Sequence, residues 1–375
     1  MKKIINVKSS ATYLDIKFIF TYDLQGKNKN YLERKSIVLL EKSVFTNNEI
    51  KKVVKKYYNI NIEKIAHEDR GSANIFYVYD LNNKYVLKEF ESRCKEEKIL
   101  QESKIIEHLK NKNIKIPKYI KTVEGEICFK YKERIIILME FIEGYTKAPN
   151  TGNFKQTIES ATLLGKITKG LEDYGKMEKV SIKKYYKKEK IEPSKIKYLS
   201  LLSKLGTSNI DEIIKKDFKY KLQLLDKIEK IDFEGMQNMT YKNSHGDFSI
   251  MQFIYKDEKV NAVLDFERAR CLPIAWEIIR SYTHIDEKCK NGDFDISNFI
   301  EYVKEVMKYI ELNKYDLKFM PYMYLLRLAT SPYGYEEYMN NNKLKSLLDF
   351  GIWRTKMCKS LIENMDEITD KLMNI

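Results

Sequence analysis

The order of hydrophobic and polar positions divides the chain into a strand-rich first part and a helical second part. Between residues 46 and 140, short segments of β-branched and aromatic residues alternate with amphipathic segments. This pattern predicts an antiparallel sheet of five strands with one helix inserted and a second helix ahead of it. The helices are expected at residues 49–58 and 96–109, and the strands at residues 62–68, 75–79, 85–90, 127–131 and 134–140.

Local signals support two of these elements. Asn47 or Asn48 can cap the first helix, because an asparagine side chain accepts the free backbone N–H groups of a first turn. The dipeptide Asn82-Asn83 joins the second and third predicted strands and favours a tight hairpin.

After residue 140 the pattern changes to long amphipathic helices. They are expected at residues 153–174, 209–231, 296–312, 321–328 and 343–373. Among them, short strands at residues 252–255 and 262–265 flank a charged turn and predict a hairpin. Residues 11–22 and 31–40 predict a further strand pair ahead of the main fold.

These elements, with the length of 375 residues, predict an α+β protein with two lobes. We expect an N-terminal strand-rich extension at residues 1–45, a small N-lobe at residues 46–140 and a larger, mostly helical C-lobe at residues 141–375.

Composition narrows the class of protein. The hydrophobic share of 43% is typical of a globular protein, and no apolar run has the length of a membrane span or of a secretory signal. We therefore expect a cytoplasmic protein with no membrane partner. The five cysteines are scattered without a CxxC pair and the four histidines lack metal-ligand spacing, which argues against a structural zinc site.

The formal charge of +14 admits nucleic acid, anionic membranes or acidic small molecules as partners. Basic residues are spread over the whole chain, however, so we do not expect nucleic acid to be the partner. The basic segment at residues 176–197 carries Tyr185 and Tyr186. It could form an acidic-ligand site or bind a single strand, but a solvated helical face with aromatic anchors is the simpler interpretation.

The candidate chemistry centres on two carboxylates that flank the predicted hairpin. His245-Gly246-Asp247 precedes the hairpin, and Leu264-Asp265-Phe266-Glu267 follows it. Phosphoryl transfer needs one carboxylate to orient the acceptor hydroxyl and another to hold the metal ions that neutralise developing charge. A hairpin brings its two ends together, so Asp247 and Asp265 are expected at one cleft.

Lys88 ends an otherwise apolar strand in the N-lobe. A lysine at such a position can pair with triphosphate oxygens and with a glutamate on the next helix. Glu102 is the favoured partner, with Glu96 and Glu97 as alternatives.

These motifs, in this order, resemble the aminoglycoside phosphotransferase and choline kinase-like family over roughly residues 48–330. The resemblance implies a protein-kinase-like fold with a five-stranded N-lobe. It also implies that Gly71, Ser72 and Asn74 belong to a loop that covers phosphates, and that backbone groups near Glu140 and Ile142 contact the purine. Within the family's catalytic motif it assigns His245 and Asp247, and it assigns Asp265 to the metal.

One position departs from the family pattern. Gln252 stands where the family usually has a metal-binding asparagine; its amide oxygen is the same ligand on a longer side chain. For His245, fixing the backbone by hydrogen bonds is favoured over proton exchange. Glu267 could add charge near the metals, or pair only with Arg268 or Arg270.

The function that the resemblance implies is Mg²⁺-dependent transfer of the γ-phosphate of ATP or GTP to a hydroxyl group of a small molecule, such as an aminoglycoside or an amino alcohol. The alternative is a non-catalytic, kinase-like nucleotide-binding or spore-coat-type structural protein. Gln252 is the residue that keeps this alternative open.

Overall fold

The computed structural model describes residues 41–68, 73–182 and 188–375. The strand pair expected at residues 11–22 and 31–40 lies outside the described residues, as do Gly71, Ser72, Tyr185 and Tyr186.

The first part of the chain folds into an antiparallel sheet. Its strand order is β1-β2-β3-β6-β4, with β5 paired to β6. The strands are β1 (Lys64–Glu68), β2 (Asn74–Tyr79), β3 (Lys84–Glu89), β4 (Tyr119–Ile120), β5 (Phe129–Tyr131) and β6 (Arg134–Glu140). All five predicted strands are present. The prediction missed β4, because two residues are too few to show a period.

Two helices cover the two faces of the sheet. The helix α1 (Asn47–Tyr58) packs on one face through Ile50 and Val54, which join Val78 and Leu87 in a small separate core. The helix α2 (Glu96–Lys110) packs on the other face, and its apolar residues belong to the main core that extends through the helical part. Lys88 follows Leu87 along β3, so its side chain lies on the α2 face.

The cap of α1 differs from the prediction. Thr46, not Asn47 or Asn48, occupies the cap position. Its hydroxyl accepts the backbone N–H of Glu49, and the Glu49 carboxylate accepts the backbone N–H of Thr46. This reciprocal pair satisfies two free donors at once, which a lone asparagine cap does not.

The second part of the chain is mainly helical. Its helices of six or more residues are α3 (Phe154–Gly170), α5 (Ile191–Leu202), α6 (Asn209–Glu229), α7 (Ile274–Ile285), α8 (Ile296–Met307), α9 (Lys314–Ala329), α10 (Tyr335–Asn340), α11 (Lys345–Glu363) and α12 (Met365–Met373). Two short strand pairs lie among them: β7 (Tyr241–Ser244) with β10 (Arg270–Pro273), and β8 (Phe253–Lys256) with β9 (Lys259–Val263).

Several helices differ from their predicted ranges. The helix α9 starts at Lys314, where Asn313 and Asp316 form a capping box, and it runs through Pro321, where the prediction had begun it. The predicted helix 343–373 is broken at Asn364 into α11 and α12. The helix α7 was not predicted; all twelve of its residues are buried, including the charged Glu277 and Arg280.

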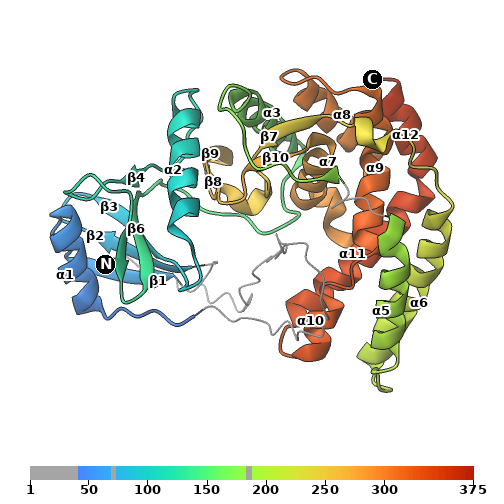
Figure 1. The fold of residues 1–375 in the computed structure, drawn as a ribbon, viewed down its shortest axis with the longest axis horizontal. Coiled ribbons are helices and arrows are strands. Elements are labelled where there is room, and N and C mark those ends of the chain that lie inside the picture. The colour runs from blue at the N-terminus through green and yellow to red at the C-terminus, as the bar shows by residue number, and fades with distance from the viewer. Residues whose placement is uncertain (1–40, 69–72, 183–187) are drawn as a thin grey trace, which may run out of the picture.

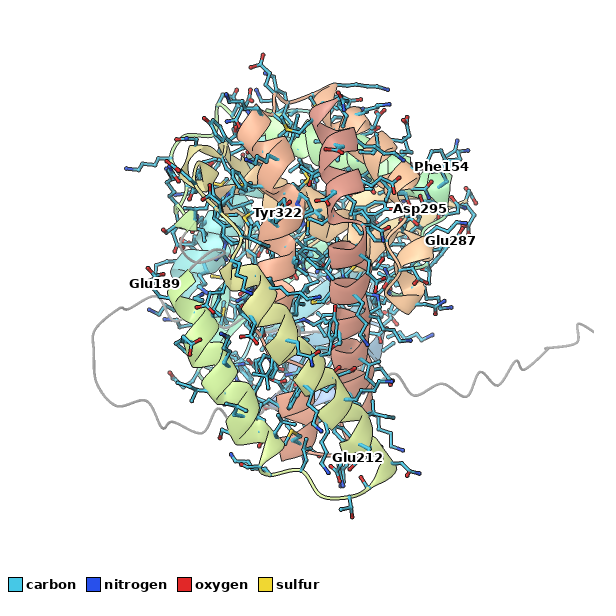
Figure 2. The ribbon with its side chains drawn as sticks, turned by 90° about the vertical axis from the view of Figure 1, so that its right-hand side faces the viewer. Phe154, Glu189, Glu212, Glu287, Asp295 and Tyr322 are labelled. Atoms are coloured by element: carbon cyan, nitrogen blue, oxygen red, sulfur yellow. The ribbon has the colours of Figure 1, made fainter. Side chains whose placement is uncertain are left out.

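The β8–β9 hairpin is confirmed, with strands shifted by a few residues. Asp257 and Glu258 form its turn, both with positive φ. The hairpin lies between the sheet and the helices, with α2 beside it (Figure 1). The end opposite the sheet holds α5 and α6, which run antiparallel: α5 begins near Glu189 and α6 near Glu212, at the opposite end (Figure 2).

Across the described ranges, no helix combines the length and apolar character that crossing a membrane requires.

Candidate active site

The segment after β6 is fixed to the β8–β9 hairpin by backbone bonds. Tyr145 and Tyr255 exchange N–H···O bonds of 2.9 and 2.8 Å. Gly144 precedes this pair with φ +145°, and a Cβ there would lie 2.2 Å from the Tyr255 carbonyl oxygen. Only glycine fits this close approach. The side chain of Ile142 packs against Ile254 on the same hairpin.

His245 connects the two predicted carboxylate motifs. Its ring is fully buried, with Nε2 2.9 Å from the carbonyl oxygen of Leu264. The backbone N–H of Asp247 donates to Nδ1 at 3.4 Å. This arrangement requires the tautomer with hydrogen on Nε2, which donates to Leu264. Both ring nitrogens are therefore engaged in holding the turn at Asp247 next to the residue before Asp265.

Gly246 allows the same turn to approach the second motif. Its φ is +80°, and a Cβ would lie 2.0 Å from the carbonyl oxygen of Arg268. A side chain at this position would push the turn away from the segment after Asp265.

Asp247 is held by two arginines that were not predicted to do so. Its Oδ1 forms an ion pair with Nη2 of Arg280 on α7, and its Oδ2 lies 3.6 Å from Nε of Arg268. The Arg280 guanidinium also donates to the carbonyl oxygen of Phe248 at 3.3 Å. The Phe248 N–H in turn donates to the buried carboxylate of Glu277, also on α7. The helix α7 thus fixes both the carboxylate and the backbone of this turn.

Asp265 adopts a conformation that few side chains occupy. Its φ is +64°, in the left-handed region that aspartate tolerates better than most residues. Its Oδ1 is buried and has no hydrogen-bond partner among the described residues. The Leu264 N–H donates to the carbonyl oxygen of Gln252 at 2.8 Å, which joins the backbone of Gln252 to the residue before Asp265.

Lys88 faces a cluster of acidic groups. Burial lowers the pKa of its ammonium, but attraction by Asp265, Glu102 and Glu267 outweighs burial and raises the pKa overall. No carboxylate of the described residues forms a direct ion pair with Lys88. Its charge is therefore balanced through space and stays available to a further anion.

Glu102 is the predicted partner of Lys88 on α2, and it is buried. Burial raises the pKa of its carboxyl to about 7, against the lowering by Lys88. Tyr119 hydrogen-bonds to the carboxylate, while Oε2 lacks a partner in the part of the chain that the structure describes. Glu267 also raises the pKa of the Lys88 ammonium, so its carboxylate lies near Lys88 and Glu102. The next residue, Arg268, contacts Asp247 instead.

The remaining predicted residues lie around this cluster. The Asn74 side chain donates to the carbonyl oxygen of Glu41 at 3.0 Å. Glu140 ends β6; its carboxylate lies 3.6 Å from Lys110 Nζ, and its backbone N–H donates to the carbonyl oxygen of Lys118 at 2.9 Å. Ile142 is buried in the small cluster with Ile254.

The residues present could hold a metal ion whose remaining ligands come from bound phosphates. Among the described residues no group of three or more His, Cys, Asp or Glu side chains could hold a metal ion alone. Asp265 nevertheless offers a buried oxygen that has no partner among the described residues, and Gln252, whose backbone is bonded to that of Leu264, carries an amide oxygen. Such a pair of oxygen ligands suits Mg²⁺, which is commonly held by one or two protein groups together with substrate phosphates.

Sequence reasoning missed Arg280, Glu277 and Tyr119 as members of the site. A signal existed for the first two: they stand three residues apart in the otherwise apolar stretch at residues 272–281 and therefore share one helix face. Two opposite charges on one buried face need partners, which here are the Asp247 carboxylate and the Phe248 N–H. Tyr119, in a two-residue strand, had no such signal.

A small antiparallel sheet, a helical lobe and this carboxylate–lysine cluster define a two-lobed, protein-kinase-like phosphotransferase. The family model described as "Phosphotransferase enzyme family" matches residues 66–290 of the 375. The chain belongs to this family, as its motifs had predicted.

Solved structures of the family have the same fold. The chain is similar to a spectinomycin phosphotransferase solved with ADP and spectinomycin (16% identity, TM-score 0.61, 89% of this chain and 100% of that chain covered). It is also similar to an aminoglycoside phosphotransferase from Alicyclobacillus acidocaldarius (13%, TM-score 0.62, 88% and 98%). A third similar structure is a choline kinase from Cryptosporidium parvum (12% identity, TM-score 0.55, 88% of this chain and 99% of that chain covered). Among proteins with curated descriptions, none matches the sequence significantly.

Proposed function

We propose that the chain is a Mg²⁺-dependent kinase that transfers the γ-phosphate of ATP or GTP to a hydroxyl group of a small molecule. The observation that carries this proposal is the cluster of Lys88, Glu102 and Asp265. Its two carboxylates each have a buried oxygen that lacks a partner within the described residues, beside an ammonium without a direct ion pair. A buried carboxylate oxygen without a hydrogen-bond partner is costly, so such a cluster is expected where a ligand completes it.

Each residue has a distinct role in this proposal. Lys88 pairs with the donor phosphates, and Glu102 balances the Lys88 ammonium. Asp265 and Gln252 hold Mg²⁺, which when bound neutralises charge on the transferring phosphate. Asp247 orients the acceptor hydroxyl, and His245 holds the turn that carries Asp247. Catalysis then comes from positioning and electrostatic stabilisation, without a covalent intermediate.

The donor site is proposed between the sheet and the β8–β9 hairpin. Backbone groups near Glu140 and Ile142 contact the purine, with the apolar Ile142–Ile254 cluster beside them. Gly71, Ser72 and Asn74 belong to the segment proposed to cover the phosphates. A similar structure, an amicoumacin kinase (15% identity, TM-score 0.51), was solved with AMP-PNP and Ca²⁺, which supports a nucleotide with a divalent cation.

Relatives support a small hydroxyl-bearing acceptor. Besides the spectinomycin phosphotransferase and the choline kinase, the similar structures include an aminopropanol kinase (10% identity, TM-score 0.53). None of the comparisons favours the non-catalytic alternative.

The test is nucleotide-dependent turnover. We expect ATP or GTP with Mg²⁺ to raise the melting temperature and nucleoside diphosphate to be released with a suitable acceptor. Asp247→Asn should lower turnover by about 10²- to 10⁴-fold, the usual contribution of a positioned acid or base. Asp293→Asn, at an exposed aspartate before α8, should have no effect. Tight nucleotide binding without turnover for any acceptor would contradict the proposal and favour the binding protein.

A further inference from the structure

A cavity of about 840 Å³ lies where the loop after α2, the helix α3 and the strand β9 meet. The loop contributes residues 112–115, α3 and the turn after it contribute residues between 159 and 173, and β9 contributes residues 260–263. Figure 1 shows these elements beside one another. The volume is in the range of about 300–1,000 Å³ that is usual for small-molecule sites. None of the described lining residues has a role in the proposed function, so this is a separate site.

Part of the lining is apolar. Leu163 of α3, Val260 of β9 and Tyr309, which follows α8, all line the cavity. Each of them packs against the main core but is only half-buried. Apolar surface that is left half-exposed in a concave site is suited to the apolar part of a ligand.

The carboxylates of the lining already have partners. Asp173 pairs with Lys112 at 2.5 Å, and Glu172 pairs with Lys169 at 2.7 Å. The third carboxylate, that of Glu159, accepts a backbone N–H of β9 at 3.1 Å. Burial raises the pKa of the Glu159 carboxyl, which opposes its negative charge.

Two further lysines of the lining form no ion pair with a carboxylate of the described residues. Nζ of Lys115 donates to the neutral side chain of Asn261 at 2.7 Å. Nζ of Lys166 lies 6.0 Å from the centroid of the Tyr309 ring. Glu305 attracts Lys166 through space but pairs directly with another lysine. Both ammonium groups are therefore available to an anion that enters the cavity.

The cavity is also bonded to the segments that are proposed to hold the donor. Asn261, which accepts from Lys115, donates through Nδ2 to the carbonyl oxygen of Glu143 in the segment after β6, at 2.8 Å. The backbone N–H of Val263, two residues before Asp265, donates to the carbonyl oxygen of Lys115 at 3.0 Å. Lys115 is thus connected to the segment proposed to contact the purine and to the strand that leads to the proposed metal ligand.

We propose that this cavity is an effector site for an organic anion with an aromatic or apolar body, and that its occupancy changes the affinity for the donor nucleotide. The anionic group pairs with Lys115 and Lys166, and the body lies on the apolar part of the lining. An anion that draws the Lys115 ammonium from Asn261 alters a contact of the segment after β6. Such coupling is reciprocal, so nucleotide changes the affinity for the anion by the same factor. Only the effect on the donor rests on the proposed function.

The test uses two fluorescent probes that differ by one charge. The anionic probe is anilinonaphthalene sulfonate, and the neutral one is N-phenylnaphthylamine, which lacks only the sulfonate. Neither carries a hydroxyl group, so neither is an acceptor. Fluorescence titration into the full chain, saturated with ADP and Mg²⁺ to close the donor site, gives both dissociation constants. At low ionic strength we expect the sulfonate to bind at least about threefold more tightly.

Lys115→Gln and Lys166→Gln should each weaken sulfonate binding by about two- to fivefold, the usual contribution of a partly exposed ion pair, and together by at least about fivefold. The affinity for the neutral probe should change little in these variants. Leu163→Ala should instead weaken both probes alike, because it removes apolar contact area. Lys219→Gln, at an exposed lysine of α6, is the matched control and should leave both dissociation constants unchanged.

The effect on the donor is measured by calorimetric titration of ADP with Mg²⁺. The dissociation constant of ADP should change by at least about threefold when the cavity is occupied by the sulfonate probe. The double variant Lys115→Gln/Lys166→Gln should lose this change, which separates an effect of the cavity from direct competition at the donor site.

Equal binding of the two probes, or binding of neither, would overturn the anion site. An unchanged sulfonate affinity in the double variant would overturn it as well, because the probe would then lie elsewhere on this basic chain. An ADP dissociation constant that does not respond to the probe would overturn the effect on the donor. Failure of the chain to bind ADP would instead refute the proposed function, while the two probes and the lysine variants would still decide on the cavity.

Discussion

Two lysines withdrawn from solvent, one in each part of the molecule, have opposite electrostatic surroundings. Lys88 on β3 is half-buried and faces Asp265, Glu102 and Glu267, which raise the pKa of its ammonium although burial lowers it. Lys221 on α6 is fully buried. Burial lowers its pKa to about 7, and Arg354 adds to the lowering that Cys358 and Asp217 only partly oppose.

The contacts of Lys221 explain why it is tolerated. Its Nζ donates to the carbonyl oxygen of Leu328 in the last turn of α9 at 3.1 Å. Its ammonium also lies 5.9 and 5.7 Å from the ring centroids of Tyr198 and Tyr335. A donor at a helix C-terminus satisfies a carbonyl that has no partner within the helix. A lysine withdrawn from solvent and surrounded by several carboxylates, such as Lys88, therefore indicates a ligand site. A buried lysine that donates to a backbone carbonyl, such as Lys221, indicates a structural role.

The largest effect is expected when the cation of the acidic cluster is removed. In Lys88→Met we expect turnover to fall by about 10²- to 10³-fold, the usual loss when one preorganised electrostatic group is removed. The donor KM should rise as well, because the ammonium is proposed to contact the donor phosphates. Steady-state nucleoside diphosphate release measures both quantities.

Lys130→Met is the matched control, since Lys130 lies on β5 of the same sheet with 68% of its side chain exposed. Its activity should stay within twofold of the unaltered chain. Equal losses in the two variants would mean that the sheet tolerates no lysine replacement, and the special role of Lys88 would be lost.

The next effect is expected at Lys221, on stability and not on turnover. Its folded pKa of about 7 lies below the 10.5 of an unfolded lysine, so the unfolded chain binds more protons between these values. The contribution of Lys221 to the free energy of unfolding is therefore fully present above pH 10.5 and is lost as the pH falls toward 7. Lys221→Met removes this dependence. Relative to it, the unaltered chain should gain about 2 kcal/mol of unfolding free energy between pH 7 and pH 9.

Denaturant unfolding at the two pH values measures this difference, and Lys227→Met, at an exposed lysine of the same helix, should show none of it. Parallel pH profiles of Lys221→Met and the unaltered chain would show that Lys221 is charged in the fold. A large loss of turnover in Lys221→Met would instead place Lys221 in the functional machinery.

The two regions also differ in how well the sequence predicts them. Lys88 is the last residue but one of β3, and Asp265 follows a hairpin with a charged turn, so motif order alone predicted that the two residues lie close together. The helical lobe was less predictable. Arg280 lies on α7, which is buried on every side, so the partner of its charge depends on how the elements around this helix pack.

The sequence does carry a signal for Lys221. This lysine stands three residues after Phe218 and four before Leu225, on the buried face of an otherwise regular amphipathic helix. A lysine on an apolar helix face is expected to be buried, but the sequence does not show which carbonyl oxygen accepts its hydrogen bond. That partner, Leu328, is more than a hundred residues away and depends on how α6 packs on α9. Side-chain partners across packed helices therefore had to come from the structure.

The smallest effect is expected at Glu102, within the acidic cluster. The folded pKa of Glu102, raised by burial to about 7, lies above its ordinary 4.5. Stability from this group is therefore complete below pH 4.5 and is lost as pH rises through 7. The ionised form is also the one that balances Lys88. Activity, measured as kcat/KM for the donor, should thus rise about tenfold across pH 6 to 8, because this ratio reports groups of the free enzyme.

Glu102→Gln should flatten that rise and remove the stability loss over the same range, while Glu107→Gln, at an exposed position of α2, should keep both. A rise that persists in Glu102→Gln would assign the titration to another group and would leave Asp265 and Glu267 as the carboxylates that set the charge of Lys88.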